Sequence, residues 1–170
     1  MVGNPEITIQ DLERLVTVRE YQGSSYGHLP FSGGDPEGHY RVLDFSTGVF
    51  SARDKRFNAY LRTQFEADIL ALYQGQEPTL SLDILADDTT GHDANRFMRV
   101  EGRVVEINYW SNSMRGSLLI HQRGYALTAR MEGTQDEVNA LRPRVEAYLS
   151  RLVQTFGLES TNKVAEREAA

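Results

Sequence analysis

The strongest helical pattern covers residues 54–73. Apolar side chains recur there three and four positions apart, as expected for a helix with one buried face. Asp54 has a side chain preferred at helix N-caps, and Gly75 is the residue type that most often follows a last helical turn. The pattern therefore predicts a helix from Asp54 to Tyr73.

A second helical pattern lies near the end of the chain. Thr134 is followed three residues later by Glu137, which is the arrangement of a capping box at a helix start. Pro143 interrupts the pattern, since proline has no N–H to donate to the preceding turn. We expect a short helix after Thr134, a kink at the proline and a main helix over Arg142–Phe156.

Strand patterns fill the region between the two helical patterns. Apolar and polar residues alternate there with a period of two, which is typical of strands with one buried face. The joints at Gly102, at 111–116 and at Gly124 are short, and short joints force neighbouring strands to run antiparallel. The predicted strands are 79–84, 96–101, 103–110, 117–122 and 125–131.

The first fifty residues carry weaker patterns. Residues 7–21 combine helical spacing with a β-branched run, which predicts a short helix leading into a strand. The segment Gly23–Gly38 is rich in glycine and proline and is expected to form a long loop. Two further predicted strands, 40–46 and 49–51, flank a tight turn at Thr47-Gly48.

Together these elements predict an α+β fold. The strands are grouped around one inserted helix and one closing helix. We therefore expect a single antiparallel sheet of about five to seven strands with two main helices packed on it. One domain would cover residues 1–158. Residues 159–170 contain almost nothing to bury and are expected to form a flexible tail.

Composition and charge narrow the class of protein. The chain has 170 residues, of which 40% are hydrophobic, enough for one buried core. Its apolar runs are far shorter than the ~20 residues that cross a bilayer, so no membrane insertion is expected. A net charge of −6 argues against nucleic-acid binding. The first ten residues do not resemble a signal peptide, which predicts a cytoplasmic protein.

Cysteine and histidine usage limits the chemistry. The absence of cysteine excludes disulfides, thiolate metal sites and a cysteine nucleophile. His28 and His39 bracket the long loop, and a hydrolase would pair one of them with a loop serine. The chain, however, lacks the G-x-S-x-G motif. The acidic segment Asp87–Asp93, which includes His92, matches no EF-hand spacing. No catalytic residue, metal site or cofactor is therefore assigned.

One group of residues has the composition of a protein interface, namely Tyr109, Trp110, Met114 and Arg115. Aromatic residues, methionine and arginine are enriched at interfaces between proteins. Strand alternation places Tyr109 on the core face and Trp110 on the polar face. A tryptophan on a polar face needs a partner, which is either a helix of its own chain or another protein. These four residues are predicted to bind another protein, and packing under a helix of the same chain is the alternative.

The second half of the chain ends with the strand RGYALTARME and the helix VNALRPRVEAYLSRLVQTFG. This order resembles the PsbP-like superfamily, in which a strand reading roughly Tyr-x-Leu-Thr-Ala precedes the closing helix. Within that superfamily, the chain resembles the Eag-type chaperones of type VI secretion, whose long helix is echoed by Tyr60, Leu61 and Gln64. The matching positions near the end are Tyr125, Leu127, Thr128, Ala129, Leu141, Pro143 and Phe156.

The resemblance implies a PsbP-like sandwich and a binding function. We expect a non-enzymatic cytosolic chaperone or adaptor that binds an apolar segment of a secreted effector or toxin, with a homodimer as the default assembly. Type III secretion chaperones, which are also small acidic α/β dimers, form a second family with similar properties. Two alternatives stay open: a small hydrolase or metal-dependent enzyme that uses the His28–His39 loop, and an immunity-type protein that blocks a partner's surface.

Overall fold

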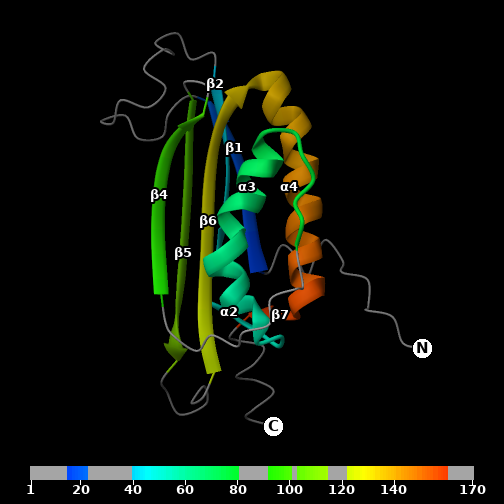
Figure 1. Ribbon diagram of the computed structural model, residues 1–170. Coiled ribbons are helices and arrows are strands. Elements are labelled where there is room, and N and C mark those ends of the chain that lie inside the picture. The colour runs from blue at the N-terminus through cyan, green and yellow to red at the C-terminus, as the bar shows by residue number, and fades with distance from the viewer. Residues whose placement is uncertain (1–14, 23–39, 81–91, 101–102, 115–121, 161–170) are drawn as a thin grey trace, which may run out of the picture.

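The computed structural model describes residues 15–22, 40–80, 92–100, 103–114 and 122–160, which form one curled antiparallel sheet with helices packed on one face (Figure 1). This arrangement confirms the predicted α+β class and the two main helices. The seven strands are β1 (Val16–Gln22), β2 (Tyr40–Thr47), β3 (Phe50–Ala52), β4 (His92–Val100), β5 (Arg103–Met114), β6 (Gln122–Thr134) and β7 (Leu158–Ser160).

The central strand of the sheet is β6. It pairs with β5 along one side, and its other side is shared by β2 and β3. Beyond these neighbours, β1 pairs with β2, β7 pairs with β3 and β4 pairs with β5. All of these pairings are antiparallel, and β4 lies at one edge of the sheet, farthest from α4 in Figure 1.

The two strands predicted on either side of Thr47-Gly48 are present, but they do not form a hairpin with each other. Ser46 pairs with Thr128 and Phe50 pairs with Tyr125, so β2 and β3 run in the same direction along β6. Three residues of this edge therefore face two residues of β6, which is a β-bulge. The predicted turn is wrong because a glycine in a strand pattern also fits a bulge.

Thr47 compensates for the backbone pairing that the bulge interrupts. Its Oγ1 accepts a hydrogen bond of 2.9 Å from the N–H of Leu127, the β6 residue beside the bulge. A buried backbone donor without a partner would be costly. The side chain of a threonine thus continues the ladder where the backbone cannot.

The first predicted helix is present with an unexpected central turn. It consists of α2 (Arg56–Tyr60), the π-helical turn η1 (Leu61–Phe65) and α3 (Glu66–Tyr73) without interruption. Asp54 satisfies a donor of the first turn, since its Oδ1 accepts a hydrogen bond of 2.9 Å from the Arg56 N–H. The apolar spacing predicted helix here, but it could not distinguish the wider turn, because a π turn adds a single residue to the helical register.

The closing helix, α4 (Gln135–Phe156), is a single element of 22 residues that passes through Pro143. The predicted separation into two helices is therefore wrong. Proline removes the donor for the carbonyl of Asn139, and both residues are exposed, so water can solvate that carbonyl. The predicted capping box of Thr134 and Glu137 is present.

The core lies between the sheet and the helices. Its largest fully buried side chains come from β2, β3, the first helix, β5 and α4. The neighbouring aromatic rings of this core have centroid distances of 4.9–5.9 Å, and they belong to Phe50, Phe57, Tyr60, Tyr125 and Phe156. The α4 stripe is equally buried, including Val138, Val145 and Leu149. The packing joins the two helices to one face of the sheet.

Several predicted boundaries shift. Thr79 and Leu80 do not belong to a strand, and Leu80 has a left-handed φ of 44°. The rest of the predicted strand 79–84 lies outside the described residues. Most of the predicted strand 117–122, the 23–38 loop and residues 161–170 also lie outside them. Glu159 and Ser160, expected in the tail, belong to β7.

Candidate functional site

The structure describes three of the four residues of the predicted interface, and it places Tyr109 and Trp110 on opposite faces of the sheet. Tyr109 points toward the helices, and its ring is 6.3 Å from that of Phe65 in an edge-on contact. Trp110, the next residue of β5, is on the opposite face of the sheet, as alternation predicts, and is half-buried. Met114 is the last residue of β5, and Arg115 lies outside the described residues.

The sheet face that carries Trp110 is strongly polar. Asp44, in β2, is buried there between two arginines from neighbouring strands, with distances of 3.1 Å to Arg19 and 3.7 Å to Arg130. The hydroxyl of Tyr21 donates a further hydrogen bond of 3.0 Å to the same carboxylate. This row of charges crosses three strands, so the face offers little continuous apolar surface.

Most of the residues considered for enzymatic chemistry lie outside the part of the chain that the structure describes. His28, His39 and most of the Asp87–Asp93 segment lie outside the described residues. His92 and Asp93 begin β4, where Asp93 is exposed. Across the parts of the chain that the structure describes, no group of three or more histidine, cysteine or acidic residues is placed to hold a metal ion.

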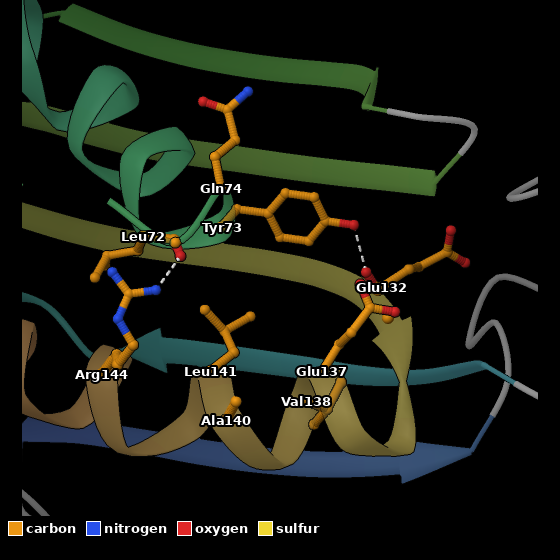
Figure 2. Close-up of a pocket in the computed structure, with 11 residues that line it drawn as sticks. Leu72, Tyr73, Gln74, Glu132, Glu137, Val138, Ala140, Leu141 and Arg144 are labelled. Carbon is orange, nitrogen blue, oxygen red and sulfur yellow. Dashed lines mark hydrogen bonds between the residues drawn. The ribbon is translucent and has the colours of Figure 1, made fainter. Parts of the chain in front are cut away.

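A cleft of about 280 Å³ lies between the end of α3 and the first half of α4 (Figure 2). Its floor is apolar and belongs to the core, while its rim carries polar and charged groups from both helices and from the end of β6. The lining residues are Leu72, Tyr73, Gln74, Gly75, Glu132, Gly133, Glu137, Val138, Ala140, Leu141 and Arg144.

The ring of Tyr73 forms one wall of the cleft. Figure 2 shows it reaching from α3 toward the end of β6, where its hydroxyl donates a hydrogen bond of 2.5 Å to the carbonyl of Glu132. Burial raises the pKa of Tyr73 to about 12. The phenol therefore stays protonated at neutral pH and serves the cleft as an aromatic surface.

Arg144 closes one end of the cleft. Its guanidinium donates two hydrogen bonds to backbone carbonyls, one of 2.8 Å to Leu72 and one of 2.6 Å to Gln76. Leu72 is in the last turn of α3, where its carbonyl also accepts a hydrogen bond from the Gly75 N–H, and Gln76 lies just beyond the helix. Arg144 thus ties the segment at the end of α3 to the side of α4 at one end of the cleft.

Glu137 borders the opposite end. Burial raises its pKa, but hydrogen bonds from the Thr134 N–H and from Arg103 outweigh this effect, and the net pKa lies below the usual value. The carboxylate of Glu132 accepts a hydrogen bond of 2.7 Å from the Val104 N–H. Each ionisable group at the cleft is therefore engaged by its own chain.

A second cavity of about 230 Å³ lies on the other side of Arg144 and shares Leu72 with the first. It is bordered by Glu77, Pro78, Pro143, Ala147, Tyr148 and Arg151. The two cavities form successive hollows along the seam between α3 and α4, separated by the arginine. An extended or helical segment could contact both, because they share that residue as a boundary.

The sequence did not predict the cleft. Leu72 and Leu141 belong to the apolar stripes of their helices, and the spacing indicated only that both are core residues. The small side chain of Ala140, four residues before Arg144, carried no signal that a hollow lies there. A hollow between two helices depends on the distance between them, and the periodic pattern of apolar residues gives no information on that distance.

Compared with family models, curated proteins and solved structures, the chain has no match. Among the described residues, no helix is long and apolar enough to cross a membrane. The site is a concave, largely apolar seam whose rim charges are engaged by their own chain.

Proposed function

We propose that this protein is a non-enzymatic chaperone or adaptor that binds an apolar segment of a secreted protein partner, an effector or toxin. The observation that carries the proposal is the cleft between α3 and α4, which is concave, apolar at its floor and bounded by Arg144 and Glu137. The proposed location is the cytoplasm, where the secretion chaperones that the sequence resembles hold their clients before export.

The size of the cleft favours a side chain of a partner over a cofactor. Sites for small molecules usually have volumes of about 300–1,000 Å³, and this cleft is at the lower limit. One large apolar side chain entering it would remove apolar surface from water at about 25 cal/mol per Å². Neighbouring residues of the same segment would reach the second cavity beyond Arg144.

The protonation states at the cleft also support binding. A general base must accept a proton near neutral pH, and a general acid must release one. Tyr73 has a pKa of about 12, and the pKa of Glu137 is below its usual value, so neither group is matched to that task. At the rim these groups are engaged by their own chain, which leaves the apolar floor as the surface that a partner would contact.

The negative net charge of the chain suggests which residues flank the apolar segment of the client. A net charge of −6 attracts basic segments at long range and raises the association rate more than the final affinity. We propose an apolar anchor flanked by basic residues. The sheet face around Trp110 is the competing site, but its buried Asp44 with two arginines makes it a poorer apolar surface.

The test begins with a cleft-filling variant. Ala140 is exposed and lines the cleft, so Ala140→Phe fills the hollow without removing a core side chain. Ala67→Phe is the matched control, because Ala67 is an exposed alanine on α3 that lines neither cavity. Wild type and both variants serve as baits in a bacterial lysate, and mass spectrometry identifies a client retained by wild type and Ala67→Phe but lost with Ala140→Phe.

Peptides from the client then locate the site. In calorimetry, an apolar peptide of that client should bind at least tenfold more weakly to Ala140→Phe than to Ala67→Phe. In heteronuclear NMR, it should shift the amide signals of 72–76 and 133–144. A blue shift of the Trp110 emission with unchanged cleft signals would move the site to the sheet face. The binding proposal fails if no client depends on either surface.

A further inference from the structure

The strand β4 offers its outer edge for pairing. Within the described ranges it pairs only with β5, and Figure 1 shows it at the border of the sheet. A nine-residue strand at an edge presents a row of backbone donors and acceptors that can pair with another strand. The side chains of that strand decide which partner fits.

The charges of β4 are complementary to a second copy of the same strand. In a two-fold antiparallel pair centred on Arg96, Asp93 lies directly opposite Arg99 of the other copy, and the contact occurs twice. Both residues are exposed in the single chain. Opposite charges directly across a strand pair are stabilising, and like charges are destabilising. This register is the one that matches both pairs.

Phe97 adds an apolar contact at the same place. Its side chain is 48% exposed, the larger value of the two large hydrophobic residues exposed among the described residues. In the register centred on Arg96, Phe97 lies opposite Asn95 of the other copy. The two Phe97 side chains, one from each copy, are then diagonal neighbours across the two-fold axis. Diagonal neighbours are within reach of aromatic side chains. The two rings would cover each other on the sheet face without helices.

The remaining like-charge contact is compensated within each chain. Arg96 would meet its own copy at the two-fold axis, on the face that carries the helices. There, each Arg96 is already 3.4 Å from Glu66, which projects from the start of α3. The axis would therefore collect two arginines and two glutamates, with no net charge.

We propose that the partner of the β4 edge is a second copy of this chain, paired antiparallel about Arg96 so that the two sheets become one. This dimer leaves the cleft between α3 and α4 open, because no cleft residue belongs to β4. The inference is thus independent of the proposed binding function. A foreign strand on the same edge is the competing occupant.

Charge exchange tests the register. The native protein should sediment as a dimer of twice its 19.2 kDa mass over a micromolar concentration series. Arg99→Asp places like charges opposite each other and should weaken the dimer at least tenfold. Adding Asp93→Arg to that variant restores the pairs and should recover most of the affinity. A monomer at every concentration, or a dimer that Arg99→Asp leaves unchanged, would overturn the proposal.

The absence of cysteine allows a second test by oxidation. Residues directly opposite in an antiparallel pair have Cα atoms about 4.5–5.5 Å apart, within disulfide range. Arg96→Cys should therefore give a covalent dimer, as should the combination of Asp93→Cys with Arg99→Cys. Asp93→Cys alone should not, because it lies about 20 Å from its own copy. Equal cross-linking of all three variants would indicate random collision and reject the register.

Discussion

The hydroxyl oxygens of Tyr60 and Tyr148 lie 2.7 Å apart, although 88 residues separate them in the chain. Tyr60 also donates a hydrogen bond of 2.5 Å to the carboxylate of Asp68. All three side chains are buried, and burial raises the pKa of both phenols. The contact joins the first helix to α4 through a polar group inside the core.

The same carboxylate should be the most sensitive member of this group. Asp68 also accepts hydrogen bonds from the N–H groups of Thr79 (3.0 Å) and Leu80 (3.3 Å). Asp68→Ala leaves the buried Tyr60 hydroxyl and the buried Leu80 N–H without this acceptor, at about 1–3 kcal/mol each. We expect it to lower the free energy of unfolding by at least about 3 kcal/mol, measured by urea titration.

Tyr148→Phe should lower the free energy of unfolding less than Asp68→Ala does. It removes one hydroxyl, while Tyr60 keeps its hydrogen bond to Asp68. The expected loss is about 0.5–1.5 kcal/mol in the same titration. If Tyr148→Phe proved more costly than Asp68→Ala, the carboxylate would not be the centre of the group.

The closing helix should depend strongly on its apolar stripe. Leu149 is 2% exposed in α4. Leu149→Ala removes buried methyl groups and leaves a cavity, so the free energy of unfolding should fall by about 2–5 kcal/mol. Arg151→Ala, at an exposed position of the same helix, should change it by no more than about 0.5 kcal/mol. A loss below about 1 kcal/mol for Leu149→Ala would place that side chain outside the core.

Acid should weaken the start of α4 through Glu137. Its pKa is lowered in the folded chain, so its contribution is present above the unfolded pKa of about 4.3 and is lost as the pH falls through the folded value. Glu137→Gln should therefore reduce the decline of the unfolding free energy between about pH 5 and pH 3. The effect will be modest, because the side chain is half exposed.

Asp136→Asn is the control for that experiment. It removes the same charge from the same helical turn but does not touch the capping box. The pH profile of this variant should follow wild type more closely than that of Glu137→Gln does. Identical profiles for the two variants would mean that the general field of the helix start, and not the hydrogen bonds of Glu137, causes the dependence.

Removing the Arg144 clamp should loosen the end of α3. Arg144→Met keeps much of the aliphatic stem but loses both hydrogen bonds to the carbonyls of Leu72 and Gln76. We expect hydrogen exchange at residues 74–80 to become at least tenfold faster. Arg144→Lys should be intermediate, because an ammonium lacks the planar fork of a guanidinium. Unchanged exchange in both variants would show that the clamp does not hold this segment.

Gly157 should tolerate no side chain. It ends α4 with a left-handed φ of 64°, and an added Cβ would lie 3.0 Å from the Cβ of Arg53. Gly157→Ala therefore combines backbone strain of about 1–2 kcal/mol with a close contact. Gly75→Ala has a similar φ of 82° but open space around it, and should cost less. Equal thermal shifts in the two variants would assign the whole effect to the backbone.

The sequence predicted the elements better than their pairing. Alternation assigned Tyr109 and Trp110 to their correct faces, because the period of a strand is local information. It could not show that β2 and β3 both pair with β6, since a strand pattern does not name its neighbour. The break predicted at Pro143 is wrong and the π turn was not predicted for a different reason: surrounding tertiary contacts keep each helix continuous. The cleft depends on the distance between two helices and had no local signal.

The central place of β6 has a consequence for the order in which the chain folds. Its strand partners β2 and β3 are complete by Ala52, yet β6 itself ends only at Thr134. A growing chain therefore exposes these earlier strands until most of the protein has been synthesised. Contacts across such sequence distances also slow folding, because a long loop must close first. The β5–β6 hairpin is the natural nucleus, and the early strands would join it late in synthesis.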